Sequence, residues 1–151
     1  FMISKKSKYA LKALEVLAEN YTQAEPLLIS GIAAKGKLPK KFLEVILLEL
    51  KNKGILASRK GKGGGYLLAM PPSAIKIGNV LRAIEGPLAP LPCLSKTAYR
   101  KCDECENEEN CGIRLVMKDA FEAQLAKLES VSLQCMLDRK CTAELVGSYE
   151  I

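Results

Sequence analysis

The segment 29–68 constrains the fold of this chain more than any other. It predicts a short helix, a turn, a longer helix from Pro39 to Gly54, and a hairpin of two short strands. Proline is tolerated in the first turn of a helix, and glycine commonly follows a helix end. The apolar residues of the longer helix recur at the spacing of one buried face: Leu43, Ile46, Leu47 and Leu50. This order of elements is that of a winged helix-turn-helix.

The predicted hairpin has strands at 55–58 and 66–69, joined by a tip that consists of lysine and glycine, residues 60–65. Such a tip has few side chains to pack and can lie against a phosphate backbone. Taken separately, the tip could be a flexible surface loop, and the longer helix could be a core helix with a solvated lysine face. Their adjacency and order favour DNA binding.

The charge distribution agrees with this interpretation. Residues 1–66 hold 13 of the 23 Lys and Arg but only 5 of the 17 Asp and Glu, whereas residues 67–151 hold 10 and 12. The cationic half is therefore the winged-helix half, as binding to DNA phosphates requires. The sequence has no histidine, so histidine-dependent catalysis is excluded and we expect no enzyme. It has no apolar run long enough to cross a membrane and no signal-peptide pattern, which predicts a cytoplasmic protein.

A helix is predicted from Ser4 to Asn20, with four lysines near its start, at positions 5, 6, 8 and 12. Cations at a helix N-terminus oppose the helix dipole, which prefers an anion there. A DNA phosphate could supply that anion, or water could solvate the lysines, and both alternatives stay open. The short helix, from about Ile29 to Lys35, is expected to brace the longer one.

Four cysteines lie within the segment 93–111, spaced C-x8-C-x2-C-x5-C, with five acidic residues between the last three. No helix or strand pattern fits this segment, so a loop held by a metal is expected. Thiolates suit both iron-sulfur clusters and zinc. A structural zinc site usually has two tight pairs of ligands, and only Cys102 and Cys105 form one here. An iron-sulfur cluster, zinc, and a metal-free loop or thiol switch remain open.

The segments around the cysteine loop are predicted to be helical. Residues 77–84 have helical spacing and end at Gly86, and a long amphipathic helix follows over 112–137. The small winged-helix domain cannot bury the whole apolar stripe of this helix, so we expect a second copy to cover it. A homodimer also suits a palindromic operator. The tail 138–151, Cys135 and Cys141 are assigned no role.

The motifs KGGGYLL after a helix-turn-helix and IKIGNVLRAIEGPL before a cysteine loop define a resemblance. Over residues 2–137 the chain resembles the bacterial winged-helix regulators that include the iron-sulfur cluster regulator, the nitric-oxide-sensitive repressor and the cysteine-metabolism repressor. The resemblance implies a homodimeric transcription regulator, usually a repressor, whose DNA affinity follows the state of a cluster in the loop. It places Glu44 at a base-reading position, Phe42 where tyrosine is common, and Lys60 where an arginine commonly enters the minor groove.

The resemblance also implies the metal ligands. Family members with a cluster have three cysteines, matched best by Cys93, Cys105 and Cys111, and the cluster would be of the 2Fe-2S type. Arg114 stands where the cluster regulator has a ligating histidine, and Lys8 stands where other members have a ligating acid. Cys102 is therefore the candidate for the fourth ligand.

The sequence thus predicts a mainly α-helical chain with a small β-hairpin wing. Residues 2–74 form the DNA-binding domain, 75–111 the connecting helix and cysteine-rich sensor loop, and 112–137 a dimerisation helix. The candidate DNA contacts are Lys5, Lys6, Lys40, Lys41, Phe42, Glu44, Arg59, Lys60, Lys62, Gly63, Gly64 and Tyr66. Two alternatives remain: a metal-free repressor controlled by a small molecule or a protein partner, and a small iron-sulfur electron carrier.

Overall fold

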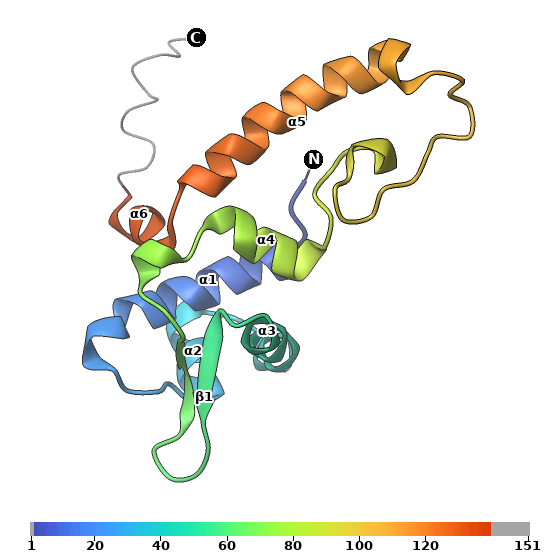
Figure 1. Ribbon diagram of the computed structural model, residues 1–151. Helices are drawn as coiled ribbons and strands as arrows, with labels where there is room; N and C mark the ends of the chain where they lie inside the picture. Colours follow the sequence, from blue (N-terminus) through green and yellow to red (C-terminus); the bar gives the residue numbers. More distant parts are fainter. Residues whose placement is uncertain (1, 140–151) are drawn as a thin grey trace.

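A computed structural model describes residues 2–139, so most of the predicted tail, with Cys141, lies outside the described residues. The chain is mainly helical with one antiparallel hairpin, as predicted (Figure 1). The elements are α1 (Lys5–Glu19), α2 (Ile29–Gly36), α3 (Lys40–Asn52), β1 (Leu56–Arg59), β2 (Gly65–Leu68), α4 (Ile77–Glu85), α5 (Gly112–Ser130) and α6 (Leu133–Asp138). Four short 3-10 turns lie between them, at Tyr21–Gln23, Pro72–Ala74, Pro92–Leu94 and Glu108–Asn110.

The core of the winged-helix part lies between α1, α2, α3, α4 and α6. The face of α3 that was predicted to be buried is buried, with no member more than 1% exposed: Leu43, Ile46, Leu47 and Leu50. They pack with the apolar face of α1, which includes Ala10, Ala13 and Leu14. Because the same helical spacing that buries one face of α3 turns its other face outward, α3 presents a fixed outer surface. This surface carries lysines and Glu44 and also exposed apolar side chains: Phe42, Val45 and Leu48.

The start of α3 and both strands of the hairpin are shifted by one residue from their predicted positions. Helix α3 begins at Lys40, because Pro39 keeps an extended backbone (ψ 120°) and acts as the N-cap. The hairpin pairs Arg59 with Gly65, so the strands are 56–59 and 65–68 rather than 55–58 and 66–69. The backbone explains the second shift: a Cβ on Gly65 would collide with the carbonyl group of Leu27, which pairs with Tyr66 as an isolated bridge. Gly65 is therefore part of the strand.

The prediction of a single helix over 112–137 is wrong. The helix breaks after Ser130, because Val131 and Ser132 are extended and pair with the segment before α4. The amide of Ile77 donates to the carbonyl of Val131 at 3.0 Å, and the amide of Leu133 donates to the carbonyl of Ile75 at 2.8 Å. Helix α6 then places Leu133, which is 0% exposed, in the winged-helix core.

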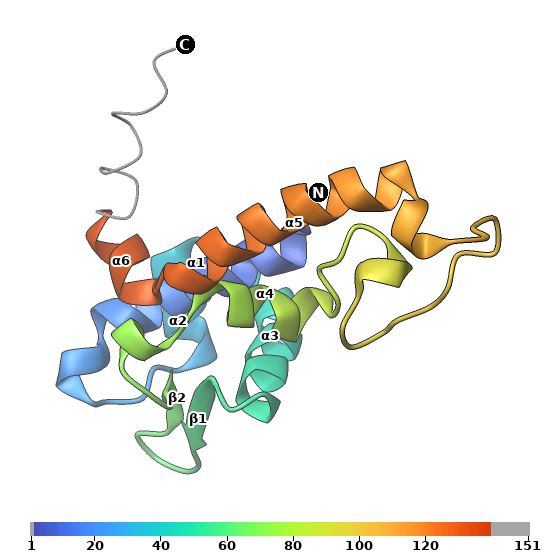
Figure 2. The same cartoon turned by 45° about the horizontal axis from the view of Figure 1, so that its top comes forward.

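Helix α5 lies along α4 and extends beyond it. The cysteine loop connects the end of α4 to the N-terminal end of α5, which is the end that projects beyond α4 (Figures 1 and 2). A salt bridge joins Arg82 of α4 to Glu129 of α5. Phe121, Leu125 and Leu128 face the second apolar cluster, around Ile77, Leu81 and Leu88. Among the described residues, no helix combines the length and hydrophobicity needed to cross a membrane.

Candidate functional site

The first half of α3 presents an outer surface with both charged and apolar side chains. Lys40, Lys41, Phe42 and Glu44 are all exposed, because Leu43 and Ile46 hold the opposite face of the helix in the core. The turn between α2 and α3 is closed by a hydrogen bond of 2.9 Å from the amide of Leu38 to the carbonyl of Ala33. Two helices joined by a short turn, with the second presenting its N-terminal half, form the arrangement that enters a major groove.

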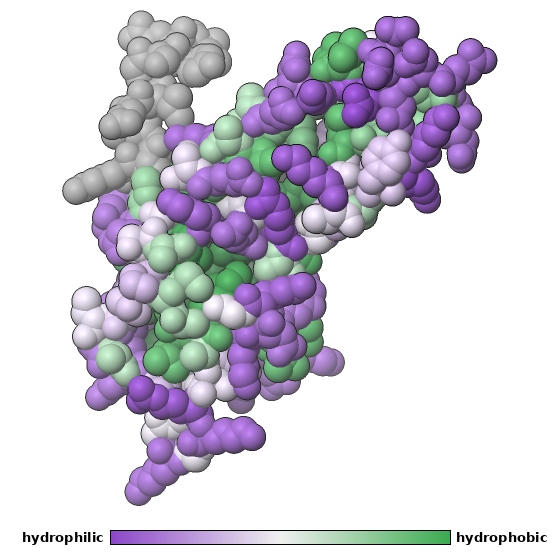
Figure 3. Space-filling view, viewed as in Figure 1, coloured by the Kyte–Doolittle hydropathy of each residue, from purple (hydrophilic) through white to green (hydrophobic). Residues whose placement is uncertain are grey.

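The hairpin carries the second group of predicted contacts. Arg59, Lys60, Lys62 and Gly63 are exposed at or beside its tip, and the tip is strongly hydrophilic on the surface (Figure 3). Gly64 is buried, and a Cβ on it would collide with the carbonyl oxygen of Arg59, so its role lies in the hairpin turn. Tyr66 is half-buried and packs against the core. The exposed cationic side chains therefore lie at the tip, and Tyr66 lies at the base of the wing.

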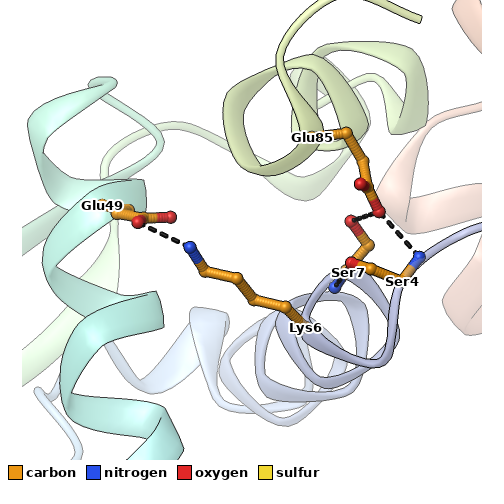
Figure 4. Close-up of polar contacts among 5 residues, drawn as sticks. All are labelled: Ser4, Lys6, Ser7, Glu49 and Glu85. Carbon is orange, nitrogen blue, oxygen red and sulfur yellow. Dashed lines mark hydrogen bonds and ion pairs between the residues drawn. The ribbon is translucent and has the colours of Figure 1, made fainter.

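The N-terminus of α1 is tied to two other helices (Figure 4). The Lys6 ammonium pairs with Glu49 of α3 at 2.6 Å, while Lys5 is exposed. Glu85, at the end of α4, accepts hydrogen bonds from the Ser4 amide at 2.7 Å and the Ser7 hydroxyl at 2.6 Å. These bonds from Ser4 and Ser7 lower the pKa of Glu85. Glu85 therefore supplies an anion at this helix N-terminus, where the sequence had left a DNA phosphate and solvation by water open as alternatives.

The loop 86–111 brings the four predicted cysteine ligands to one pocket. Cys93, Cys102, Cys105 and Cys111 all line a pocket of about 390 Å³ at the start of α5. Cys93 is buried in the turn Pro92–Leu94, and Cys111 is the N-cap of α5. The loop is held by a hydrogen bond of 3.2 Å from the Arg100 amide to the Pro92 carbonyl, and by one of 2.6 Å from the Tyr99 hydroxyl to Glu108.

The thiols differ in their surroundings. The exposed Cys102 thiol donates to the Glu104 carboxylate at 3.0 Å, which raises the pKa of Cys102 and lowers that of Glu104. Burial raises the pKa of Cys105, and the neighbouring Cys111 adds to this effect. Without a metal, Cys102 and Cys105 therefore stay protonated more readily than free cysteine. A bound cation would reverse that preference.

The donor set of this pocket fits a thiolate-ligated group, although the thiols surround the pocket rather than meet at one point. Among residues 2–139, no three Cys, Asp or Glu side chains converge closely enough to hold a metal ion. Four soft sulfur donors nevertheless share one pocket. Arg114 lines the same pocket, and its buried Nε has no hydrogen-bond partner among the described residues. A buried donor of this kind fits an anionic occupant, such as a cluster with thiolate ligands.

A helix-turn-helix with a cationic hairpin beside it defines the class of winged-helix DNA-binding regulators. The sequence matches one family over residues 3–139, the Rrf2 family, described as iron-dependent transcriptional regulators. This chain belongs to the Rrf2 family. It is a DNA-binding transcriptional regulator and not an enzyme, as predicted.

Individual relatives agree with the family. The chain is 46% identical over 138 residues to a helix-turn-helix transcriptional regulator of Rhodobacter capsulatus described as rrf2-like, covering 90% of this chain and 92% of that protein. It is 27% identical over 149 residues to the regulator IscR of Yersinia enterocolitica, covering 99% and 81%. The structure of CymR, the global cysteine regulator of Bacillus subtilis, superposes with a TM-score of 0.71 at 27% identity, covering 93% and 98%. The predicted winged-helix fold is confirmed by this similarity.

Sequence reasoning missed two features of the site. Val45 is 55% exposed on α3 beside Phe42, although its apolar character suggested no surface role. Glu85 contacts α1 across 78 residues, and no local pattern could have indicated this. A usable signal existed for Val45 alone: it lies off the stripe formed by Leu43, Ile46, Leu47 and Leu50.

Proposed function

We propose that the protein is a homodimeric repressor that places α3 in the major groove and the hairpin tip beside it. The exposed cationic surface carries this proposal: lysines of the α3 N-terminus and of the wing tip are exposed on the same winged-helix unit. Their charge favours phosphate contacts, and the exposed Glu44 of α3 would read a base edge. Lys5 at the α1 N-terminus adds a further phosphate contact, whereas Lys6 is engaged by Glu49.

The second copy is proposed to pack on α5. Its far half carries apolar side chains on a face that α4 does not cover, with Ile113 71% and Val116 68% exposed. Ala120 and Ala123 continue this face and are also exposed. Small and β-branched residues at this spacing suit close packing of two helices. Two copies joined there would present two α3 helices to the half-sites of a palindromic operator.

Operator affinity is proposed to depend on an iron-sulfur cluster, or on the redox state of the thiols, in the cysteine pocket. Cys93, Cys105, Cys111 and Cys102 would hold the cluster, which when bound supplies a redox-sensitive centre with negative charge. The family description as iron-dependent supports iron over zinc. The pocket containing all four thiols is the observation from this chain that supports it.

The proposed coupling to DNA runs through Glu85. The cysteine loop begins directly after this residue, which holds the N-terminus of α1, and Lys6 of α1 holds Glu49 of α3. A change of order in the loop would alter how α4 ends, and therefore how firmly α1 and α3 are held. Such coupling requires that the two loop arrangements differ in their free energy of DNA binding.

A metal-free repressor is the second candidate, because the similar CymR is described as a global cysteine regulator. Anaerobic purification, followed by absorption spectra, iron, sulfide and zinc analysis and DNA-binding titration, separates the two. A coloured protein with iron and sulfide, whose DNA affinity changes on exposure to air, supports cluster control. A colourless, metal-free protein that binds its operator normally supports the alternative.

A further inference from the structure

The exposed face of α3 carries an apolar surface that the proposed charge contacts do not use. Phe42 and Val45, one helical turn apart, are 60% and 55% exposed. Both line a hollow of about 540 Å³ between α1 and α3. On the α1 side, the ring of Tyr9 lies 6.2 Å from that of Phe42, centroid to centroid, at an angle of 56°. The Phe42 ring is therefore held at the edge of the hollow while most of it stays in contact with solvent.

The charges around this hollow indicate what kind of partner it can bind. Lys5, Lys6 and Lys41 line it, and no carboxylate does. Glu49, the acid of α3 that pairs with Lys6, does not line the hollow. A matching partner therefore presents apolar groups set among negative charges. The major groove of DNA has this pattern, because the 5-methyl groups of thymines lie on its floor between two rows of phosphates.

We infer that Phe42 and Val45 contact thymine methyl groups in the operator, so that α3 selects thymine at the base pairs facing the hollow. The inference deepens the proposed function and rests on it, because it requires α3 to lie in the major groove. Glu44 lies between the two apolar residues in sequence and is exposed. An acidic side chain accepts from the amino group of cytosine, whereas apolar side chains prefer the thymine methyl. One turn of α3 would then read both kinds of base edge.

The test removes the methyl groups without other change. A duplex enriched by the wild-type protein from a random-sequence library is synthesised again with deoxyuridine in place of thymidine, and both are titrated. The wild-type protein should bind the deoxyuridine duplex about fourfold more weakly for each methyl group contacted. The double variant Phe42→Ala/Val45→Ala should bind the two duplexes equally, although with lower affinity for the thymidine duplex.

Leu48→Ala is the matched control. Leu48 is 49% exposed on the same helix but does not line the hollow, so this variant should keep the wild-type ratio of the two affinities. Equal binding of the two duplexes by the wild-type protein would overturn the inference and leave the proposed function intact. A protein that binds no duplex would overturn both.

A second copy or a protein partner could instead cover the hollow. In that case the double variant would keep the wild-type ratio of affinities but change its state of association in analytical ultracentrifugation. That result would also overturn the inference. If Leu48→Ala also bound the thymidine and deoxyuridine duplexes equally, the methyl contacts could not be assigned to Phe42 and Val45 at the hollow.

Discussion

Ser7 and Glu85 are 78 residues apart in the sequence and share a hydrogen bond of 2.6 Å, in which the Ser7 hydroxyl donates to the Glu85 carboxylate. The bond joins the first turn of α1 to the last turn of α4, from which the cysteine loop departs. Together with the amide of Ser4, it gives Glu85 a lower pKa in the folded protein than in the unfolded chain. The contact therefore has a measurable pH dependence.

Glu85→Gln should reduce the sensitivity of the protein to acid. Because the folded pKa of Glu85 is lowered, its ionised form adds stability above its unfolded pKa, and this contribution is lost as the pH falls through the folded pKa. The wild-type free energy of unfolding should therefore fall more steeply than that of the variant between about pH 6 and about pH 3. Urea denaturation across this pH range measures the free energy of unfolding of the wild type and of the variant. Glu19→Gln, at the exposed end of α1, is the control, and parallel curves for wild type and Glu85→Gln would contradict the prediction.

Replacing Lys60 and Lys62 by alanine should weaken binding to every DNA sequence. Each exposed lysine that contacts a phosphate releases a counterion, so the slope of log affinity against log salt should fall by about two for each wing, or about four for the proposed dimer. Fluorescence anisotropy at several salt concentrations measures the slope. Lys96→Ala/Lys118→Ala removes the same charge away from the wing and should leave the slope unchanged. An unaltered slope in the wing variant would argue against contact between wing and phosphate.

Glu44→Gln should change which sequences are bound more than how tightly the best one is bound. Glu44 is exposed on α3, where a carboxylate accepts hydrogen bonds from base amino groups and repels phosphates. The variant should therefore tolerate more sequences and bind non-specific DNA at least as well as the wild type. Selection from a random library, sequenced for both proteins, compares their preferences. Identical enriched motifs would remove Glu44 from the base-reading residues.

Val116→Asp should disrupt the proposed dimer. Val116 is 68% exposed on α5, so the monomer should tolerate the change, but burying a carboxylate between two copies should weaken dimerisation at least about tenfold. Sedimentation equilibrium measures the dissociation constant. Glu122→Lys, on the opposite face of the same helix, should have no comparable effect. If the Val116 variant formed a dimer of unchanged stability, the dimer interface would not include this part of α5.

Cys102→Ser should test the fourth ligand of the proposed cluster. If Cys102 ligates, the variant purified without oxygen should contain less iron and lose its absorption faster in air than the wild type. Asp103→Asn, in the same exposed stretch of the loop, keeps all four thiols and should retain the cluster. Equal iron content and equal decay in Cys102→Ser would leave Cys93, Cys105 and Cys111 as ligands and require a different fourth group.

The parts of the fold that local chemistry dictates could be predicted from the sequence. The buried stripe of α3 follows from helical spacing, and the hairpin follows from the glycines of its tip. Helical spacing does not predict the break between α5 and α6, because it continues through the break, where the backbone of Val131 and Leu133 pairs with residues 75–77 instead. A local signal was present, since Ser132 caps α6 by accepting a hydrogen bond from the Cys135 amide at 3.1 Å.

The candidate site divides in the same way. Spacing and resemblance predicted that the four cysteines share one site, and in the structure all four line one pocket. The partner of Lys6 and the partners of Glu85 come from distant helices, so only the packed chain reveals that these charges are engaged. Nothing in the sequence distinguishes the lysines of the α1 N-terminus from one another, whereas in the structure Lys6 is paired with Glu49 and Lys5 is exposed.

The position of α6 has a consequence for a broken chain. Leu133 is buried among helices that precede the cysteine loop, and the neighbouring backbone is bonded to residues 75–77. A single proteolytic cut within 96–110 would therefore yield two polypeptides that stay assembled, held together by buried side chains and backbone pairing instead of by the covalent backbone. The connection that carries the thiols can thus be severed while α6 stays packed in the winged-helix core.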